Sequence, residues 1–353
     1  MIEQHFGSAL TVGVEEEVMI LDADTLELTP RVAALVSRVE GRALPGVLKT
    51  ELHASVVELT SERSDSPEQA IERALDLRAT AADLAEREGL LLAAAGSHPI
   101  SIASEQEIAA DERYREFVDY AGPTARRQGV SGLHVHVGMP DAETCYRVLE
   151  QVLPWLPLVL ALSANSPYFE GRETGMRSIR AEVLGILPRH AAPPPVRSYA
   201  EWEAFVERMV ATGLAGTPTS FWWDVRPHPQ FGTLEIRMPD QPTSAAVTAA
   251  FVRLLHDLCA WALDAPPRRY DPSERGVYEQ NRWAASRFGP HGKLIHPDRG
   301  EAMEVPDLVA DLPVAVADLD AHACEADRQL DVGRRDGLRA VCADLVRRTK
   351  VET

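Results

Sequence analysis

The chain has 353 residues, 45% of them hydrophobic and 25% charged, a composition typical of a folded globular protein and not of a disordered one. An excess of 54 acidic over 36 basic residues gives a formal charge of −18, which makes nucleic acid an unfavourable partner. Four widely spaced cysteines without CxxC spacing predict reduced thiols in a cytoplasm. The chain opens without a signal-peptide pattern, and its longest apolar stretch, residues 152–164, is too short to span a bilayer, so we expect no membrane association.

The predicted elements begin with a strand at residues 11–21. This segment, TVGVEEEVMIL, is rich in β-branched residues and leads into the turn-like DADT and a second short strand at LTP. Apolar residues then recur at helical spacing over residues 67–88, after Ser66 as a candidate N-cap. Residues 67–88 are therefore predicted to form a long amphipathic helix packed on the sheet.

Strands and helices of varied position follow along the chain. Further strands are predicted at residues 90–95, 132–138, 221–225 and 232–238. Helices are predicted at residues 105–120, 142–164, 199–212 and 244–263, and about the last 80 residues have a helical pattern. Hairpin-like pairs at both ends favour an antiparallel or mixed sheet covered on one side. We therefore expect an α+β fold and one domain over residues 1–353, with a helical C-terminal part from about residue 265.

Two carboxylates share one face of the first strand. Side chains two apart in a strand point the same way, so Glu15 and Glu17 project together. Glu16 falls on the apolar side and is not expected to be a ligand. A solvated strand face is the commoner reason for an isolated ExE pattern. Glu51 and Glu58, in KTELHASVVELTSER, add two acidic candidates, although each alone is more readily explained as structural.

Two later strands repeat this arrangement. GLHVHVG places His134 and His136 on one face, which indicates a metal or phosphate site, or else a pair of hydrogen-bonded sheet histidines. GTLEIRMPD places Glu235 and Arg237 together, which an internal salt bridge would explain equally well. The recurrence in separate segments favours one shared site. Carboxylates with an imidazole suit Mg²⁺ or Mn²⁺ better than Zn²⁺.

A nucleotide would have to bind on the sheet itself. The sequence contains no GxxxxGK[ST], no GxGxxG after a strand and no GxSxG. Because Mg²⁺ and Mn²⁺ in such sites usually bridge nucleotide phosphates, we expect ATP over the face that carries the acidic groups.

Five motifs together resemble the type 2 glutamate–cysteine ligase family, the bacterial YbdK-like carboxylate–amine ligases. They are TVGVEEEVMILD, ELHASVVELTSERS, GLHVHVG, LSANSPYFEGRETGMRS and WWDVRPHPQFGTLEIRMPD. The similarity runs in order from about residue 11 to 281. It implies a compact fold like the catalytic domains of glutamine synthetase and the guanidino kinases. In that fold a curved, mainly antiparallel sheet has helices on its outer face, and ATP and several Mg²⁺ ions lie over the concave face.

The resemblance also implies roles for individual residues. Metal ligands are implied at Glu15, Glu17, Glu51, Glu58, His134 and Glu235. His136, Arg226 and Arg237 would lie by the nucleotide phosphates, and the two arginines would act catalytically by stabilising the transferring phosphoryl group. Substrate binding is implied for Asn165, Arg177, Arg180 and Arg282, although loop caps and surface charge would explain these four equally well.

The implied reaction is ATP-dependent amide formation through an acyl phosphate, with glutamate and cysteine as candidate substrates. The family also suggests a homodimer or small homo-oligomer. One alternative is a guanidino-kinase-like phosphotransferase, which would yield a phosphorylated and not a condensed product. The other is a catalytically silent metabolite-binding homologue. The crowding of like charges, which raise one another's pKa, argues against the silent homologue.

Overall fold

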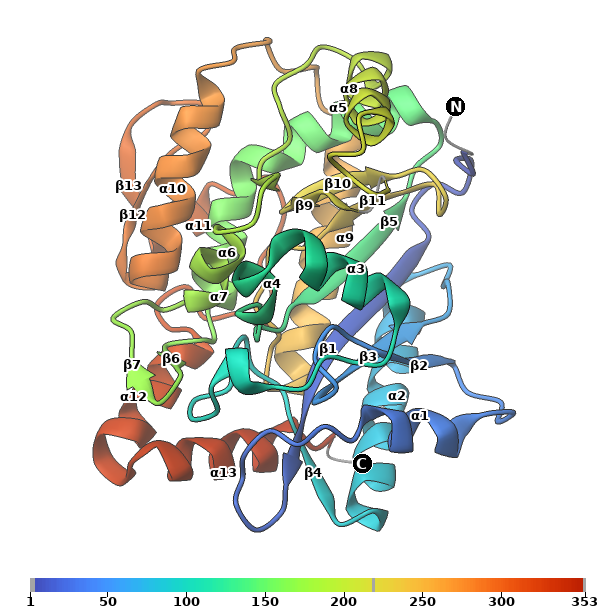
Figure 1. Ribbon diagram of the computed structural model, residues 1–353. Helices are drawn as coiled ribbons and strands as arrows, with labels where there is room; N and C mark the ends of the chain where they lie inside the picture. Colours follow the sequence, from blue (N-terminus) through green and yellow to red (C-terminus); the bar gives the residue numbers. More distant parts are fainter. Residues whose placement is uncertain (1–3, 218–219, 352–353) are drawn as a thin grey trace.

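The computed structural model describes residues 4–217 and 220–351, and a seven-stranded sheet forms its centre (Figure 1). The strands are β1 (Val12–Asp22), β2 (Gly46–Thr50), β3 (Val56–Ser61), β4 (Leu90–Ala93), β5 (Leu133–Gly138), β10 (Val225–His228) and β11 (Thr233–Ile236). They lie in the order β10-β11-β5-β1-β3-β2, with β4 paired to the end of β1. Each of these pairings is antiparallel. The expected α+β class and mainly antiparallel sheet are therefore confirmed.

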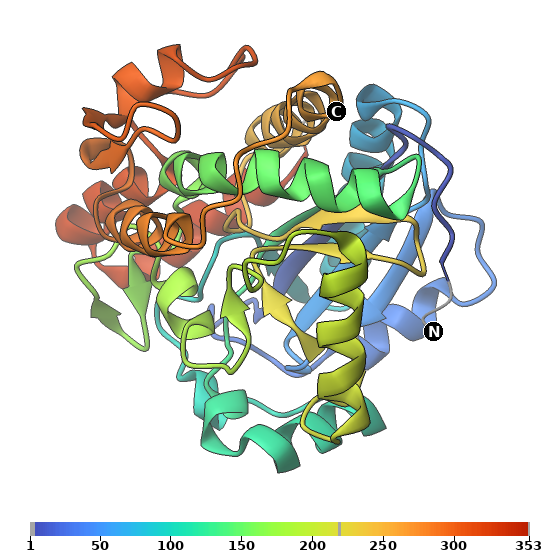
Figure 2. The same ribbon diagram turned by 90° about the horizontal axis from the view of Figure 1, so that it is seen from above.

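Three long helices cover one face of the sheet. They are α2 (Pro67–Arg87), α5 (Ala142–Val152) and α9 (Ala245–Asp264), and Figure 2 shows them together on one side. The side chain of Ser66 caps α2 by accepting a hydrogen bond from the backbone N–H of Gln69, as predicted. Val14 and Ile20 of β1 are completely buried in the cores beneath these helices. Burial of each such side chain contributes about 1.5–3 kcal/mol.

The opposite face of the sheet is covered only in part. The C-terminal helices α12 (Glu325–Asp336) and α13 (Leu338–Thr349) close its lower end, where Met19 and Leu21 of β1 form a core cluster with Val341 and Leu345. Helices α3 (Glu112–Ala121) and α4 (Pro123–Arg126) stand in front of the sheet (Figures 1 and 2). The middle of this face carries the polar residues of the candidate site.

The remaining elements surround this framework. The helices are α1 (Val32–Val39), α6 (Leu156–Ser163), α7 (Ile179–Leu184), α8 (Tyr199–Ala211), α10 (Glu274–Phe288) and α11 (Val305–Ala310), with short 3-10 turns η1 (Ala103–Glu105), η2 (Leu153–Trp155) and η4 (Gly289–His291). The short strands are β6 (Tyr168–Phe169), β7 (Arg172–Glu173), β8 (His190–Ala191), β9 (Trp222–Trp223), β12 (Lys293–Ile295) and β13 (Ala302–Glu304).

Several predicted boundaries were wrong, each for a local reason. The helix predicted at residues 142–164 is interrupted by the 3-10 turn η2, which contains Pro154, because proline has no N–H to continue the helical ladder. The helix predicted from residue 105 begins only at Glu112, where the Asp111 side chain caps its first turn. The C-terminal part, expected to be helical, also contains the hairpin of β12 and β13.

Among the residues that the structure describes, two helical spans are long and apolar enough to cross a membrane by length and composition. They are Ala142–Ser163 and Ala245–Asp264, and 83% and 56% of an apolar 18-residue window in each is buried inside the molecule. Packing against the sheet and neighbouring helices explains their apolar character, as it does in the core helices of water-soluble proteins. These spans are therefore weak grounds for expecting a membrane.

Candidate active site

The register of the sheet brings the polar residues of four strands together on the open face. Glu15 of β1 lies opposite His134 of β5. On the next row, His136 of β5 lies opposite Glu235 of β11, and Glu235 lies opposite Arg226 of β10. Directly opposite side chains in an antiparallel pair share a face and are separated by about 4.5–5.5 Å at Cβ. The alternation predicted within each strand thus becomes a single polar cluster.

Three of these side chains form a group that can hold a cation. One ligand atom from each of Glu15, His136 and Glu235 lies within 4.8 Å of the other two. Two carboxylates with one imidazole are a donor set suited to Mg²⁺ or Mn²⁺. We expected His134 among the ligands and His136 beside the phosphates, whereas the geometry groups His136 with the two carboxylates.

His136 is oriented for coordination by a hydrogen bond on the far side of its ring. Its Nδ1 lies 2.9 Å from Thr233 Oγ1, while the buried Nε2 lies 3.6 Å from Glu15 Oε1. This Nε2 has no hydrogen-bond partner among the residues that the structure describes. When Nδ1 donates its proton to Thr233, Nε2 presents a lone pair to the cluster, as in metal-binding histidines. Burial lowers the pKa of His136, but the Glu15 and Glu235 carboxylates outweigh burial and raise it overall.

His134 lies between two carboxylates at the edge of the cluster. Its Nδ1 is 3.3 Å from Glu15 Oε2, and its Nε2 is 3.7 Å from Glu17 Oε1. In the described part of the chain, this Nε2 also lacks a hydrogen-bond partner. Burial raises the pKa of Glu15, but His134 and His136 together outweigh that effect and hold it well below its ordinary value. The Glu15 carboxylate therefore favours its ionised form, and each of its oxygens lies beside one of the two imidazole rings.

Glu235 lies between two arginines. Its Oε2 accepts from Arg226 Nε at 2.5 Å, and its Oε1 accepts from Arg237 Nη1 at 2.5 Å. Burial raises the pKa of Glu235, but the charges of Arg226 and Arg237 outweigh burial and hold it well below its ordinary value. The internal salt bridge considered from the sequence is thus present, and it holds both guanidinium groups beside the carboxylate cluster.

Glu51 and Glu58 extend the cluster toward β2 and β3. Glu58 lies opposite Glu17 in the register, and its Oε1 accepts from Lys49 Nζ at 3.1 Å and from Thr60 Oγ1 at 2.7 Å. Burial raises the pKa of Glu51 to about 8, and the charges of Glu17 and Glu58 add to that effect. Burial also raises the pKa of Glu58. A bound cation would relieve this crowding of carboxylates.

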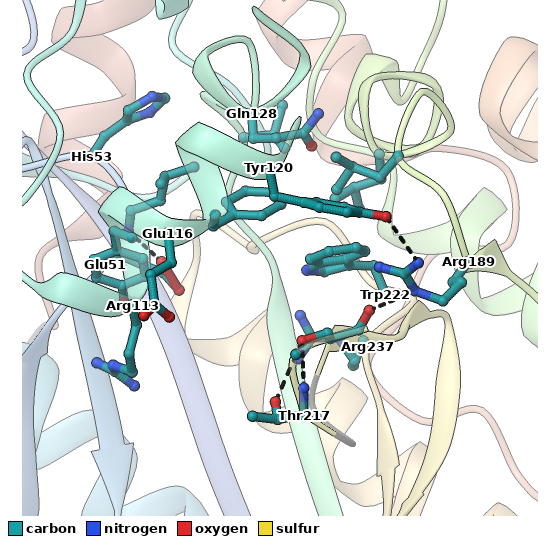
Figure 3. A pocket seen from close by; sticks show the side chains of 18 of the residues that line it. Glu51, His53, Arg113, Glu116, Tyr120, Gln128, Arg189, Thr217, Trp222 and Arg237 are labelled. Atoms are coloured by element: carbon teal, nitrogen blue, oxygen red, sulfur yellow. Dashed lines mark hydrogen bonds between the residues drawn. The ribbon is translucent and has the colours of Figure 1, made fainter. Parts of the chain in front are cut away.

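A pocket of about 550 Å³ adjoins the cluster, a size suited to a small-molecule ligand. Its lining carries charged and polar side chains, among them Glu17, Glu51, His134, Arg180 and Arg237. It also carries aromatic side chains, namely Tyr114, Phe117 and Tyr120 of α3 and Trp222 of β9. Figure 3 shows Glu51 and Arg113 on one side of the view and Trp222, Arg189 and Arg237 on the other.

Of the four predicted substrate-binding residues, Arg180 lines this pocket. Its Nη1 donates to the Met238 carbonyl oxygen at 3.1 Å, and its Nη2 donates to the Arg237 carbonyl oxygen at 3.0 Å. The guanidinium group passes so close to Gly132 that a Cβ at that position would collide with it. Arg180 therefore fixes the backbone from which Arg237 projects.

The other three predicted substrate-binding residues lie outside the pocket lining and bind the framework. The buried Asn165 side chain donates to Gln241 O and Thr243 Oγ1, both at 2.9 Å. Arg177 forms an ion pair with Asp327, and Arg282 forms one with Asp224. Their partners come from distant parts of the chain, so sequence motifs alone did not show that these groups hold loops and helices together.

A polar network behind the site escaped the sequence patterns. The completely buried Glu16 and Arg78 form an ion pair, with Arg78 Nε 3.0 Å from Glu16 Oε2. Gln241 Nε2 donates to Glu16 Oε1 at 3.0 Å, and Gln241 Oε1 accepts from the Glu17 N–H at 3.1 Å. The network thus connects α2 to the backbone that presents Glu17. In the sequence, the sign of this network is one charged residue on the apolar face of each element, Glu16 in the strand and Arg78 in the helix.

The match to known proteins decides the family. Residues 11–337 match the family model of glutamate–cysteine ligase family 2. The chain belongs to this family. A *Rubrobacter xylanophilus* relative, provisionally described as glutamate–cysteine ligase 2-3, is 38% identical over 355 residues, covering 95% of this chain and 96% of the relative. A *Herpetosiphon aurantiacus* relative, provisionally described as glutamate–cysteine ligase 2, is 34% identical over 96% of this chain and 93% of its own.

Two solved structures of other proteins have a fold similar to that of this chain. Glutamate–cysteine ligase from *Francisella tularensis*, solved in complex with AMP, has a TM-score of 0.68 at 15% identity, covering 98% of this chain and 89% of that one. A bifunctional glutathione synthetase from *Pasteurella multocida* has a TM-score of 0.66 at 17% identity, covering 96% of this chain and 50% of that one. As a member of glutamate–cysteine ligase family 2, the protein is an ATP-dependent carboxylate–amine ligase.

Proposed function

We propose that this ligase activates its carboxylate substrate as an acyl phosphate and that the polar cluster on the sheet is its reaction centre. The observation that carries the proposal is the group formed by Glu15, His136 and Glu235, set beside the guanidinium groups of Arg226 and Arg237. Metal-binding groups next to fixed positive charges are the arrangement that phosphoryl transfer requires. The AMP bound to the *Francisella* ligase also supports a nucleotide on this fold.

The residues of the cluster fit a divalent metal, with Mg²⁺ as the expected ion and Mn²⁺ as an alternative. Glu15, His136 and Glu235 would hold one ion, because they offer two carboxylates and a buried imidazole nitrogen oriented toward them. His134 and Glu17, with Glu51 and Glu58 beyond them, are proposed ligands for further ions. When bound, the ions would neutralise phosphate charge that otherwise repels an anionic nucleophile.

In the first step, an oxygen of the substrate carboxylate attacks the γ-phosphorus of ATP. The bond from this phosphorus to the bridging oxygen breaks, and ADP leaves with the bonding electrons. Arg237 lines the pocket, and Arg226 is held beside it by the shared partner Glu235. Both guanidinium groups would stabilise negative charge on the transferring phosphoryl group without reorganising.

In the second step, the amine nitrogen attacks the carbonyl carbon of the acyl phosphate. A C–N bond forms, the C–O bond to phosphate breaks, and the proton lost by nitrogen leaves on the released phosphate. Glutamate and cysteine, the pair in the family's name, are the first substrates to test.

We also propose the coarser features that the family suggests. Residues 1–353 would form a single catalytic domain that acts in the cytoplasm as a homodimer or small homo-oligomer. Light scattering on the purified protein tests the assembly, and a monomer at micromolar concentration would contradict it.

The ligase proposal is tested by pairing ADP release with identification of the product. Purified protein, Mg²⁺ and ATP are screened against pairs of amino acids, other carboxylates and amines, with mass spectrometry of each product. Ligation predicts a condensed product lacking one water, whereas a substrate that gains only a phosphoryl group would overturn it.

Variants then test the residues of the cluster. Glu15→Ala and Glu235→Ala should abolish ADP release, while Glu72→Ala, on the exposed side of α2, serves as the control. Parent activity in both site variants would show that the metal assignment is wrong.

A further inference from the structure

An exposed aromatic ring lies beside the cation-binding group. Phe231, in the turn between β10 and β11 (Figure 1), is 59% exposed, more than any other large hydrophobic side chain in the described part of the protein. Its ring lies 5.6 Å from the ring of His136, one of the three residues that can hold a cation. Single exposed apolar side chains are common in soluble proteins, but this one adjoins the candidate reaction centre. A molecule bound at the cluster can therefore reach it.

One face of the Phe231 ring is covered and the other is open. The His228 ring stacks on it with a centroid distance of 4.2 Å and an interplanar angle of 7°. The buried Nδ1 of His228 has no hydrogen-bond partner among the described residues, so the imidazole serves here as a flat surface behind the phenyl ring. Because His228 covers one face, the exposed area of Phe231 belongs to its outer face and its edges. A nucleobase stacks on a face of this kind.

The turn that carries Phe231 is held by backbone contacts. The N–H groups of Phe231 and Gly232 donate to His228 O at 3.1 and 2.9 Å, and the N–H of His5 donates to Pro229 O at 2.9 Å. Gly232 has a φ of +66°, and a Cβ at this position would collide with His5 O, so the turn requires glycine. The ring is thus preorganised, and a base that stacks on it does not have to order the loop.

The register places Phe231 and the pocket at opposite ends of the polar cluster. The pocket contacts His134 of β5. Two further rows of paired residues follow toward the turn, namely His136 with Glu235 and Arg226, and then Thr233 with His228. Successive rows on one face are two residues apart, which is about 6.6–6.8 Å. A carboxylate in the pocket would attack the γ-phosphorus from that end, so the base of ATP would point the other way, toward Phe231.

We propose that Phe231, backed by His228, is the platform on which the base of ATP stacks. The inference rests on the ligase function proposed above and adds the residue that binds the base. The base lies on the outer face of the phenyl ring, and the phosphates extend from it over the cation-binding group toward the pocket. Stacking uses the flat face that every nucleobase has, so the platform adds affinity for the nucleotide without a strong choice among bases.

Calorimetric titration of the purified protein with MgATP, without carboxylate or amine, tests the platform. Phe231→Ala removes the ring, and Phe231→Leu keeps apolar bulk without a flat face. Both change a largely exposed position and should fold, which circular dichroism checks. Affinity for MgATP should fall at least about fivefold in both, whereas Phe231→Trp should keep or raise it. Phe288→Ala, at a 41% exposed position at the end of α10, is the matched control and should bind MgATP like the parent.

Mn²⁺ affinity separates stacking on a base from support of the cation group. Electron paramagnetic resonance without nucleotide should give the parent Mn²⁺ affinity in Phe231→Ala, because the ring supplies no ligand. Thr233→Val, which removes the partner of His136 Nδ1, should lower that affinity. Equal losses of MgATP and Mn²⁺ affinity in Phe231→Ala would overturn the inference. So would an unchanged MgATP affinity in both Phe231→Ala and Phe231→Leu.

The same titrations separate the inference from the ligase function. A parent protein that binds MgATP with an affinity insensitive to the residue at position 231 leaves the ligase function standing and contradicts the platform. A parent protein that does not bind MgATP at millimolar concentration would contradict the ligase function, and the inference would fall with it.

Discussion

Arg78→Met should destabilise the protein strongly, although it keeps most of the volume and apolar stem of the side chain. Arg78 and its ion-pair partner Glu16 are both 0% exposed. The guanidinium group also donates to Thr243 O at 3.0 Å, to Pro242 O at 3.3 Å and to Thr248 Oγ1 at 2.9 Å. Methionine can replace none of these donors, so a carboxylate and several acceptors lose buried partners at once.

The magnitude follows from what remains around Glu16. Removing one partner of a buried ion pair costs about 3–5 kcal/mol. Glu16 Oε1 still accepts from Gln241 Nε2 and Thr248 Oγ1, both at 3.0 Å, so we expect the lower end, about 3 kcal/mol. This is a large share of the roughly 5–15 kcal/mol that stabilises a typical domain. The double variant Glu16→Leu/Arg78→Met removes the unpaired charge and should recover at least half of the loss.

Urea unfolding at pH 7, followed by far-ultraviolet circular dichroism and tryptophan fluorescence, measures these differences. Arg87→Met changes an exposed arginine of the same helix and should alter stability by less than about 0.5 kcal/mol. The reasoning is refuted if Arg78→Met costs less than about 1 kcal/mol, or if the double variant is no more stable than the single one.

Two further predictions concern cation binding. Burial raises the pKa of Glu51 to about 8, so below pH 8 this group holds a proton that a cation must displace. Mn²⁺ affinity, followed by electron paramagnetic resonance, should therefore rise by up to about tenfold per pH unit for each proton displaced below pH 8. Glu51→Gln should flatten the rise, and a pH-independent parent would contradict the account. The metal-free fold should correspondingly lose the Glu51 contribution to stability as pH rises from about 4.5 through 8, because its folded state binds the proton more tightly than the unfolded chain. Thr233→Val removes the partner of His136 Nδ1 and should weaken Mn²⁺ binding about 10–100-fold. Thr25→Val, in an exposed turn, should leave the affinity unchanged, and equal affinities in the two variants would count against the proposed orientation of His136.

The parts of the site that could be predicted from sequence depend on local geometry. Alternation along a strand is a property of the backbone, so Glu15 and Glu17 could be placed on one face and Glu16 on the other without knowing the fold. His134 and His136 followed in the same way. The antiparallel register then joined these local pairs, which alternation alone does not specify.

The parts that could not be predicted depend on contacts across long stretches of chain. Arg177 and Asp327 are separated by 150 positions, and no local pattern shows that they pair. Arg180 and Arg282 were both predicted to bind substrate, yet of these two Arg180 alone lines the pocket. The two-residue strands β6 to β9 are too short to produce a period of alternation.

The central claim is that the carboxylate is activated by phosphorylation on the sheet, and transfer of an oxygen isotope tests it most directly. The carboxylate identified by the screen of substrate pairs is labelled with ¹⁸O in both oxygens and converted with ATP and its amine. Mass spectrometry of the released inorganic phosphate should then find one ¹⁸O atom per amide formed, because the attacking carboxylate oxygen leaves with the phosphate. Unlabelled phosphate, with the amide formed at the normal rate, would contradict an acyl phosphate.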